Sequence, residues 1–146
     1  MSVNTQILLA YGFIIDSDDE SFLKSLVNRF PHLEGKSFKS ICGDFNRFYW
    51  ESESGYAEEI MQGYRHLEVR GVAKESYSEK LDKLVVVATA SVDELWNKYS
   101  ERHTNLAFDT NQGTVPDKVA NEFFNFQAEF GLESKKPHPV IWYEYV

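Results

Sequence analysis

The sequence is poor in cysteine and contains no long apolar run. Cys42 is the only cysteine among 146 residues, so no disulfide can form within the chain, and we expect a reducing compartment. The apolar stretch 7–15 is too short to cross a bilayer, and no basic segment of the secretory-signal type precedes it. These features predict a cytoplasmic protein with no membrane anchor.

Basic residues are also scarce relative to acidic ones. The chain has 15 lysines and arginines against 23 aspartates and glutamates, for a net charge of −8. The sequence shows neither a basic stripe nor a basic arm. Because a protein binds the phosphate backbone through clustered cations, direct binding to a nucleic-acid backbone is not expected.

Motifs with known chemistry are missing as well. The sequence contains no phosphate-binding glycine loop, no G-x-S-x-G and no H-E-x-x-H, and its four histidines lack metal-ligand spacing. Two alternatives remain open. Asp16 and Asp18 would suit a divalent metal at the end of a strand, and Cys42 would act as a nucleophile if a histidine lay nearby. The alternative for the two aspartates is a solvated helix start, and the alternative for Cys42 is a buried, unreactive thiol. We favour these alternatives, and therefore expect no cofactor and a non-enzymatic protein.

Two segments, "SDDESFLK" (Ser17–Lys24) and "SVDELWNK" (Ser91–Lys98), share the pattern S-x-D-E. Each follows an apolar run that reads as a strand. In both, the serine would accept from first-turn N–H groups and the glutamate three residues later would reach back to the cap. The pattern therefore predicts two capping boxes, each opening an amphipathic helix.

The hydrophobic pattern predicts an α+β fold in a single domain, 1–146. We expect a mixed sheet of about four or five strands, with three or so helices packed on it. The predicted strands of this sheet are Ile7–Ile15, Leu84–Ala90, Val140–Tyr145 and one or two within 37–50, beginning with "SFKSIC", and 66–73 is a candidate for a further strand. Predicted helices are Ser17–Phe30, a short one over 55–64, one from about Leu95, and one over 115–130 that Gly131 ends in a left-handed conformation. Gly12 indicates a bulge or a close backbone approach.

Aromatic residues and arginine concentrate in "FNRFYWESESGY", Phe45–Tyr56. On a strand, Arg47 and Tyr49 would share one face and require water, an acid or a partner, while Phe48 and Trp50 would face the core. Tyrosine, tryptophan and arginine anchor protein interfaces, although a packed hairpin core and a base-stacking surface are alternatives. The interface candidates are Arg47, Tyr49, Phe45, Tyr56, Arg65 and Arg70.

The two ends of the chain are similar to a known group. An opening strand "ILLAYGFIID", a Phe-rich helix "NEFFNFQAEFGL" and a closing "PVIWYEYV" resemble small uncharacterised accessory proteins of tailed phages and prophages. The likeness covers about forty residues and carries no functional residue. It implies an accessory phage gene, many of which encode small acidic proteins that bind host proteins.

Charge and resemblance together predict a non-enzymatic acidic binding protein. Its partner would be a host or bacterial protein with a basic surface. The chain would then be a phage inhibitor of a bacterial defence system or of a host enzyme, and it would act by mimicking nucleic acid. An immunity protein or antitoxin against a basic toxin would have the same composition, and a neighbouring toxin gene would distinguish it. A small metal-dependent hydrolase or nucleotide-binding protein that uses the acids of 16–20 is the third class.

Overall fold

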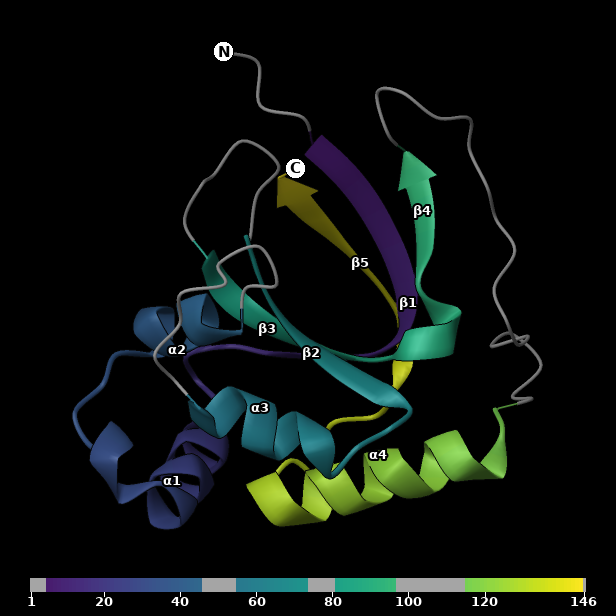
Figure 1. The fold of residues 1–146 in the computed structure, drawn as a ribbon. Helices are drawn as coiled ribbons and strands as arrows, with labels where there is room; N and C mark the ends of the chain where they lie inside the picture. Colours follow the sequence, from purple (N-terminus) through teal and green to yellow (C-terminus); the bar gives the residue numbers. More distant parts are fainter. Residues whose placement is uncertain (1–4, 46–54, 74–80, 97–114, 146) are drawn as a thin grey trace.

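A five-stranded antiparallel sheet forms the centre of the protein in the computed structural model, which describes residues 5–45, 55–73, 81–96 and 115–145 (Figure 1). The strands are β1 (Thr5–Ile15), β2 (Leu67–Ala73), β3 (Leu81–Ala88), β4 (Asp93–Trp96) and β5 (His138–Tyr145). The helices are α1 (Glu20–Arg29), α2 (Phe38–Asp44), α3 (Gly55–Gln62) and α4 (Asp117–Phe130), with 3-10 turns η1 (Pro31–Leu33) and η2 (Thr89–Ser91). The predicted α+β fold is confirmed, although all described strand pairs are antiparallel rather than mixed.

The sheet curls until four of its strands form a ring. Its order is β3-β2-β5-β1-β4, and β3 also pairs with β1. The long β1 makes this closure because it curves through the molecule: Thr5 to Gly12 pair with β5, and Gly12 to Ile15 pair with β3 (Figure 1). Gly12 lies at the crossover, where a Cβ atom would stand 1.9 Å from the carbonyl oxygen of Val86, so the predicted close approach is confirmed.

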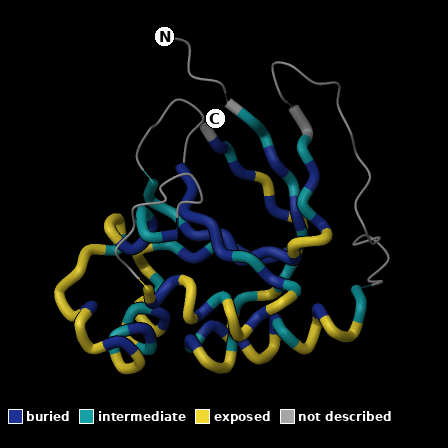
Figure 2. Tube along the Cα trace, viewed as in Figure 1, coloured by how far each residue is buried: buried dark blue, intermediate teal, exposed yellow. Residues whose placement is uncertain are grey.

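Alternation along the strands produces two apolar clusters. One face of the sheet packs against the helices, and Figure 2 shows those helices buried on the sheet side and exposed on the outside. The apolar cluster between this face and the helices includes Phe13, Ile15, Leu84, Val86, Phe22, Phe123, Phe126 and Phe130. The other face lies inside the ring and is filled by Leu8, Ala10, Val72, Val85, Val87, Val140 and Trp142.

Two predicted elements have the wrong secondary structure. "SFKSIC" is not a strand but most of α2, because Phe38, Ile41, Cys42 and Phe45 recur at helical spacing and Ser37 caps the helix, its Oγ accepting from Ser40 N–H at 3.2 Å. The segment from Asp93 to Trp96 is strand β4 rather than the start of a helix.

The other predicted elements are present. The strands within β1, β2, β3 and β5 and the helices α1, α3 and α4 lie where the apolar pattern placed them. Gly131 ends α4 with φ 68°, as predicted for a left-handed cap. The proposed strand continues from Phe45 into residues 46–54, which lie outside the described residues.

Candidate functional site

The loop after β1 is folded by its own aspartates. Asp16 N–H donates to Asp19 Oδ2 at 2.9 Å, and Asp18 N–H donates to Asp16 Oδ1 at the same distance. Asp19, rather than Ser17, occupies the N-cap position of α1. Its carboxylate accepts a hydrogen bond from Asp16 N–H, which precedes the helix, and from no N–H group of the first helical turn. The predicted capping box at Ser17 is therefore wrong, although acids do gather at the helix start.

The predicted box at Ser91 is also wrong, because no helix follows. Ser91 is fully buried within η2, where its Oγ accepts from Tyr11 N–H at 2.9 Å and donates to the Ala88 carbonyl at 2.7 Å. The strand partners of β1 change here from Val87, opposite Gly12, to Asp93, opposite Leu9. The chain therefore advances six residues from Val87 to Asp93 while its partners on β1 move only three residues, from Gly12 to Leu9. The hydroxyl of Ser91 supplies hydrogen bonds where these three extra residues interrupt the ladder.

A surface hollow of about 300 Å³ lies beside the loop that follows β1. It is lined by Asp16, Ser17 and Asp18 from this loop, Phe38 and Lys39 from the start of α2, and Asp82 and Lys83 from the start of β3. Three carboxylates and two ammonium groups therefore surround it. Lys83 Nζ lies 3.8 Å from Asp16 Oδ2, too far for a hydrogen bond. The volume is at the lower limit for ligand pockets and suits a group as small as one side chain.

Asp82 is the unusual member of this lining. Its Oδ1 atom is buried and has no hydrogen-bond partner. Its charge is felt by the neighbouring Cys42, where burial, followed by the negative charge of Asp82, raises the pKa of the thiol to about 12. Cys42 is fully buried, as expected for an unreactive thiol. A buried acceptor without a donor is uncommon in folded proteins.

The metal alternative rested on Asp16 and Asp18. Among the residues that the structure describes, no three His, Cys, Asp or Glu side chains lie together as metal ligands. Asp16 instead turns its oxygens toward Asp18 N–H and Lys83, while Asp18 is exposed.

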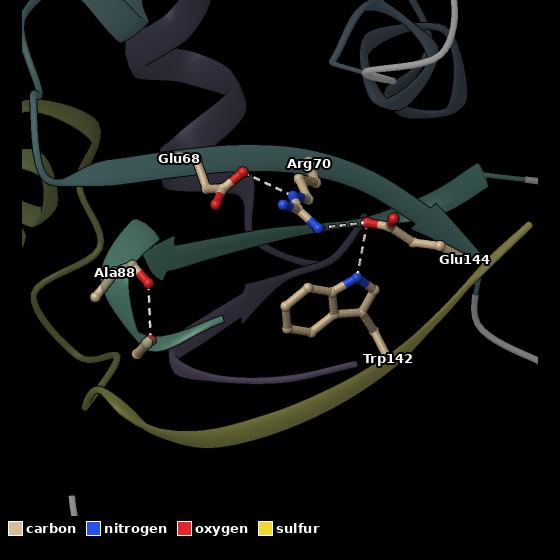
Figure 3. Close-up of polar contacts among 6 residues, drawn as sticks. Glu68, Arg70, Ala88, Trp142 and Glu144 are labelled. Atoms are coloured by element: carbon tan, nitrogen blue, oxygen red, sulfur yellow. Dashed lines mark hydrogen bonds and ion pairs between the residues drawn. The ribbon is translucent and has the colours of Figure 1, made fainter. Parts of the chain in front are cut away.

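A second polar cluster is buried between β2 and β5 (Figure 3). Arg70 donates from Nε to Glu68 at 2.7 Å and from Nη1 to Glu144 Oε1 at 3.0 Å, and its guanidinium lies 5.8 Å from the Trp142 ring centre. Trp142 Nε1 donates to the same Glu144 oxygen at 3.0 Å. Because described backbone pairing between these strands is limited to Ala73 and Tyr143, the cluster is a major connection between them.

Most of the described interface candidates are core residues. Phe45, Tyr56 and Arg70 are 7%, 3% and 7% exposed. Tyr56 packs edge-on against Phe45 and donates to Asp44 at 2.7 Å; burial, followed by this hydrogen bond, raises the pKa of its hydroxyl. The core alternative thus holds for these two aromatic side chains. Arg65 is exposed, and its interface role stays a prediction.

The remaining two interface candidates, Arg47 and Tyr49, lie outside the described residues, so their predicted exposure also stays a prediction.

Several residues of the two polar sites were not singled out from the sequence. Asp82 and Lys83 open an otherwise apolar strand, and Glu144 is the lone charge in "WYEY". A charged residue that interrupts a buried strand is a usable signal, because it must be paired or solvated. Phe38 carried no such signal, since its place beside the hollow depends on α2 packing against β3.

None of the helices in the described ranges is long and apolar enough to cross a membrane. No family model matches the chain, and no curated protein or solved structure is significantly similar to it.

Proposed function

We propose that this chain is a non-enzymatic binding protein whose acidic surface covers a basic surface on a bacterial protein. In this proposal it serves a phage as an inhibitor of a host defence system or enzyme. The cytoplasm of the host is the compartment where such a partner would be met.

The observation that carries the proposal is the charge of the folded part. The described residues include 17 acidic and 10 basic side chains, a net charge of −7. Half of these bases are held in ion pairs within the chain, namely Arg29, Lys36, Arg70, Lys83 and Lys135. The same ion pairs take up seven of the acids, so ten acids and five bases of the described residues lie outside them.

Such a surface favours fast, salt-dependent association. Complementary charge raises the association rate constant, and exposed charges are screened beyond about 10 Å at 0.1 M ionic strength. A nucleic-acid-binding protein presents the kind of cationic surface that this chain would occupy, which is the physical content of nucleic-acid mimicry.

The phage origin rests on the resemblance of the two end segments alone, and these segments pair as β1 and β5 over eight residues. If the inhibitor role is correct, bacteria that express the chain should plate a phage more efficiently when a defence system would otherwise restrict it. Unchanged plating across a panel of defence systems would argue against that role.

Binding itself can be tested with immobilised protein and host lysate. We expect proteins retained at about 0.01 M ionic strength to have basic surfaces and to associate much more slowly at about 0.15 M, where the screening length falls from about 30 to about 8 Å. Biolayer interferometry on the partner identified by mass spectrometry measures this. Association that does not change with salt would contradict the proposal.

A further inference from the structure

We propose that the outer face of β1, β4 and β5 is a docking surface for a segment of the protein partner that carries apolar side chains and one lysine or arginine. This inference rests on the proposed function: the surface would hold the partner after opposite charges have brought the two proteins together. We call this surface the outer patch, and its residues are Ile7, Leu9, Asp93, Ile141 and Tyr143.

Strand pairing brings these five side chains together. Leu9 lies directly opposite Ile141 of β5 on one side and opposite Asp93 of β4 on the other. Ile7 lies opposite Tyr143 in the same way, two residues along β1. Directly opposed residues of an antiparallel pair point to the same face, and so do residues two apart on one strand. The five side chains therefore share one face of the sheet.

The residue after Asp93 shows which face this is. Glu94 pairs with Leu8, whose side chain lies inside the ring of strands. Glu94 Oε2 also accepts from Gln6 Nε2 at 3.2 Å, and Gln6 shares the inner face with Leu8. Since successive side chains on a strand alternate, Asp93 points outward with Leu9.

The outer patch is apolar although water reaches it. Ile141 is 55% exposed, and Ile7, Leu9 and Tyr143 are partly exposed. The helices pack against the part of this face that holds Phe13, whereas β1, β4 and β5 continue beyond them (Figure 1). An antiparallel sheet that faces water usually carries polar side chains there. Neighbouring apolar side chains that remain exposed are typical of an interaction surface.

Asp93 adds a charge that the fold does not pair. Only 8% of this residue is exposed, and neither carboxylate oxygen forms a hydrogen bond or ion pair within the described residues. Oδ2 is buried, whereas Oδ1 remains accessible to solvent and therefore to a group that lies on the patch. Burial of a carboxylate without a donor costs free energy, and a lysine or arginine on the partner would offset that cost.

The same carboxylate argues against a second copy of this chain as the occupant. The outer patch contains no cation, so a symmetric dimer through it would bury two Asp93 carboxylates without an opposite charge. The net charge of −8 also opposes self-association. Charge complementarity therefore favours a partner segment that combines apolar side chains with a cation.

The test is an NMR titration of the intact protein with three pentapeptides, LSLSK, LSLSQ and SSSSK, each acetylated and amidated. In an extended peptide the first, third and fifth side chains share one face, so LSLSK presents two leucines and a lysine together. We expect LSLSK to shift the amide signals of Leu9, Asp93 and Ile141 most. It should bind about tenfold more tightly than either LSLSQ or SSSSK.

Two variants separate the contributions of charge and apolar contact. Asp93→Asn keeps the shape and removes the charge, so it should abolish the preference for LSLSK over LSLSQ. Ile141→Ser should weaken LSLSK about fivefold. Phe124→Ser is the matched control, because Phe124 on α4 is 70% exposed and lies outside the outer patch, and it should leave binding unchanged. If either patch variant unfolds, the comparison of the three peptides on the wild type carries the test.

Four results would overturn the inference, and they separate it from the proposed function. Hexalysine that shifts amides over the whole surface, with LSLSK no tighter than SSSSK, would mean charge attraction without the outer patch. Equal losses in Ile141→Ser and Phe124→Ser would mean unspecific apolar contact. A wild-type dimer that Ile141→Ser converts to a monomer in sedimentation would mean that a second copy occupies the patch. If neither hexalysine nor LSLSK bound at about 0.01 M ionic strength, the proposed function would fail as well.

Discussion

The two S-x-D-E segments have the same pattern and different structures. After Ser17 the chain turns within the loop and forms α1, whereas after Ser91 it forms strand β4. Ser17 is exposed, while Ser91 is fully buried and hydrogen-bonded to Tyr11 and Ala88. The same local pattern is therefore followed by a helix in one place and by a strand in the other.

What differs is the neighbouring backbone. When the chain leaves η2, Leu8 and Leu9 of β1 lie alongside and pair with Glu94 and Asp93. Strand pairing with β1 satisfies the backbone there, and a four-residue strand is formed despite the helical signal. After Asp16 the chain has passed the end of β1, so a helix that buries Phe22 and Leu26 is formed.

The largest expected effect comes from separating β1 from β3. Gly12→Ala would place a Cβ 1.9 Å from the Val86 carbonyl oxygen, and we expect a loss of about 3 kcal/mol or more in the free energy of unfolding. Urea denaturation measures it. Gly43→Ala is the control, since nothing lies within 4 Å of its Cβ and alanine favours a helix. Equal stability of the two variants would show that β1 does not cross β3 at Gly12.

Ser91→Ala tests the buried serine directly. It removes the acceptor for Tyr11 N–H and the donor to Ala88, so we expect a loss of about 1–3 kcal/mol. Ser17→Ala should change stability by less than about 0.5 kcal/mol, because that side chain is exposed. Chemical denaturation of both variants compares them. Similar losses of stability in Ser17→Ala and Ser91→Ala would contradict this account and support the predicted pair of capping boxes.

The smallest effect concerns the true N-cap of α1. Asp19 Oδ2 accepts from Asp16 N–H and lies 3.0 Å from Lys135 Nζ, so Asp19→Ala should cost about 1 kcal/mol. Asp18→Ala, which removes an exposed carboxylate from the same loop, is the control and should be nearly neutral. Thermal unfolding would contradict this assignment if Asp18→Ala were the more damaging change.

Apolar periodicity predicted much of the fold. Long runs such as 7–15 identified strands, and Gly131 identified the end of α4. α2 was missed because its seven residues resemble a short strand, although the spacing of Phe38, Ile41 and Phe45 is helical. β4 could not be predicted from its own residues, since its partner is distant in sequence.

The candidate site was only half visible in the sequence. Asp16 and Asp18 stood out as acids after a strand, but among the described residues no third ligand lies with them. Asp82 and Phe38 line the same hollow as these two aspartates only because β3 and α2 pack beside the loop. The sequence also could not distinguish core from interface for Tyr56, which is buried, because an aromatic residue suits both places.

The most direct test is NMR of the two segments in the intact protein. We predict helical Cα and Cβ shifts for residues 20–29, extended shifts for residues 93–96, and cross-strand NOEs from Leu8 and Leu9 to Asp93 and Glu94. Helical shifts at 93–96 without those NOEs would contradict the account, because Ser91 would then cap a helix as Ser17 was predicted to do.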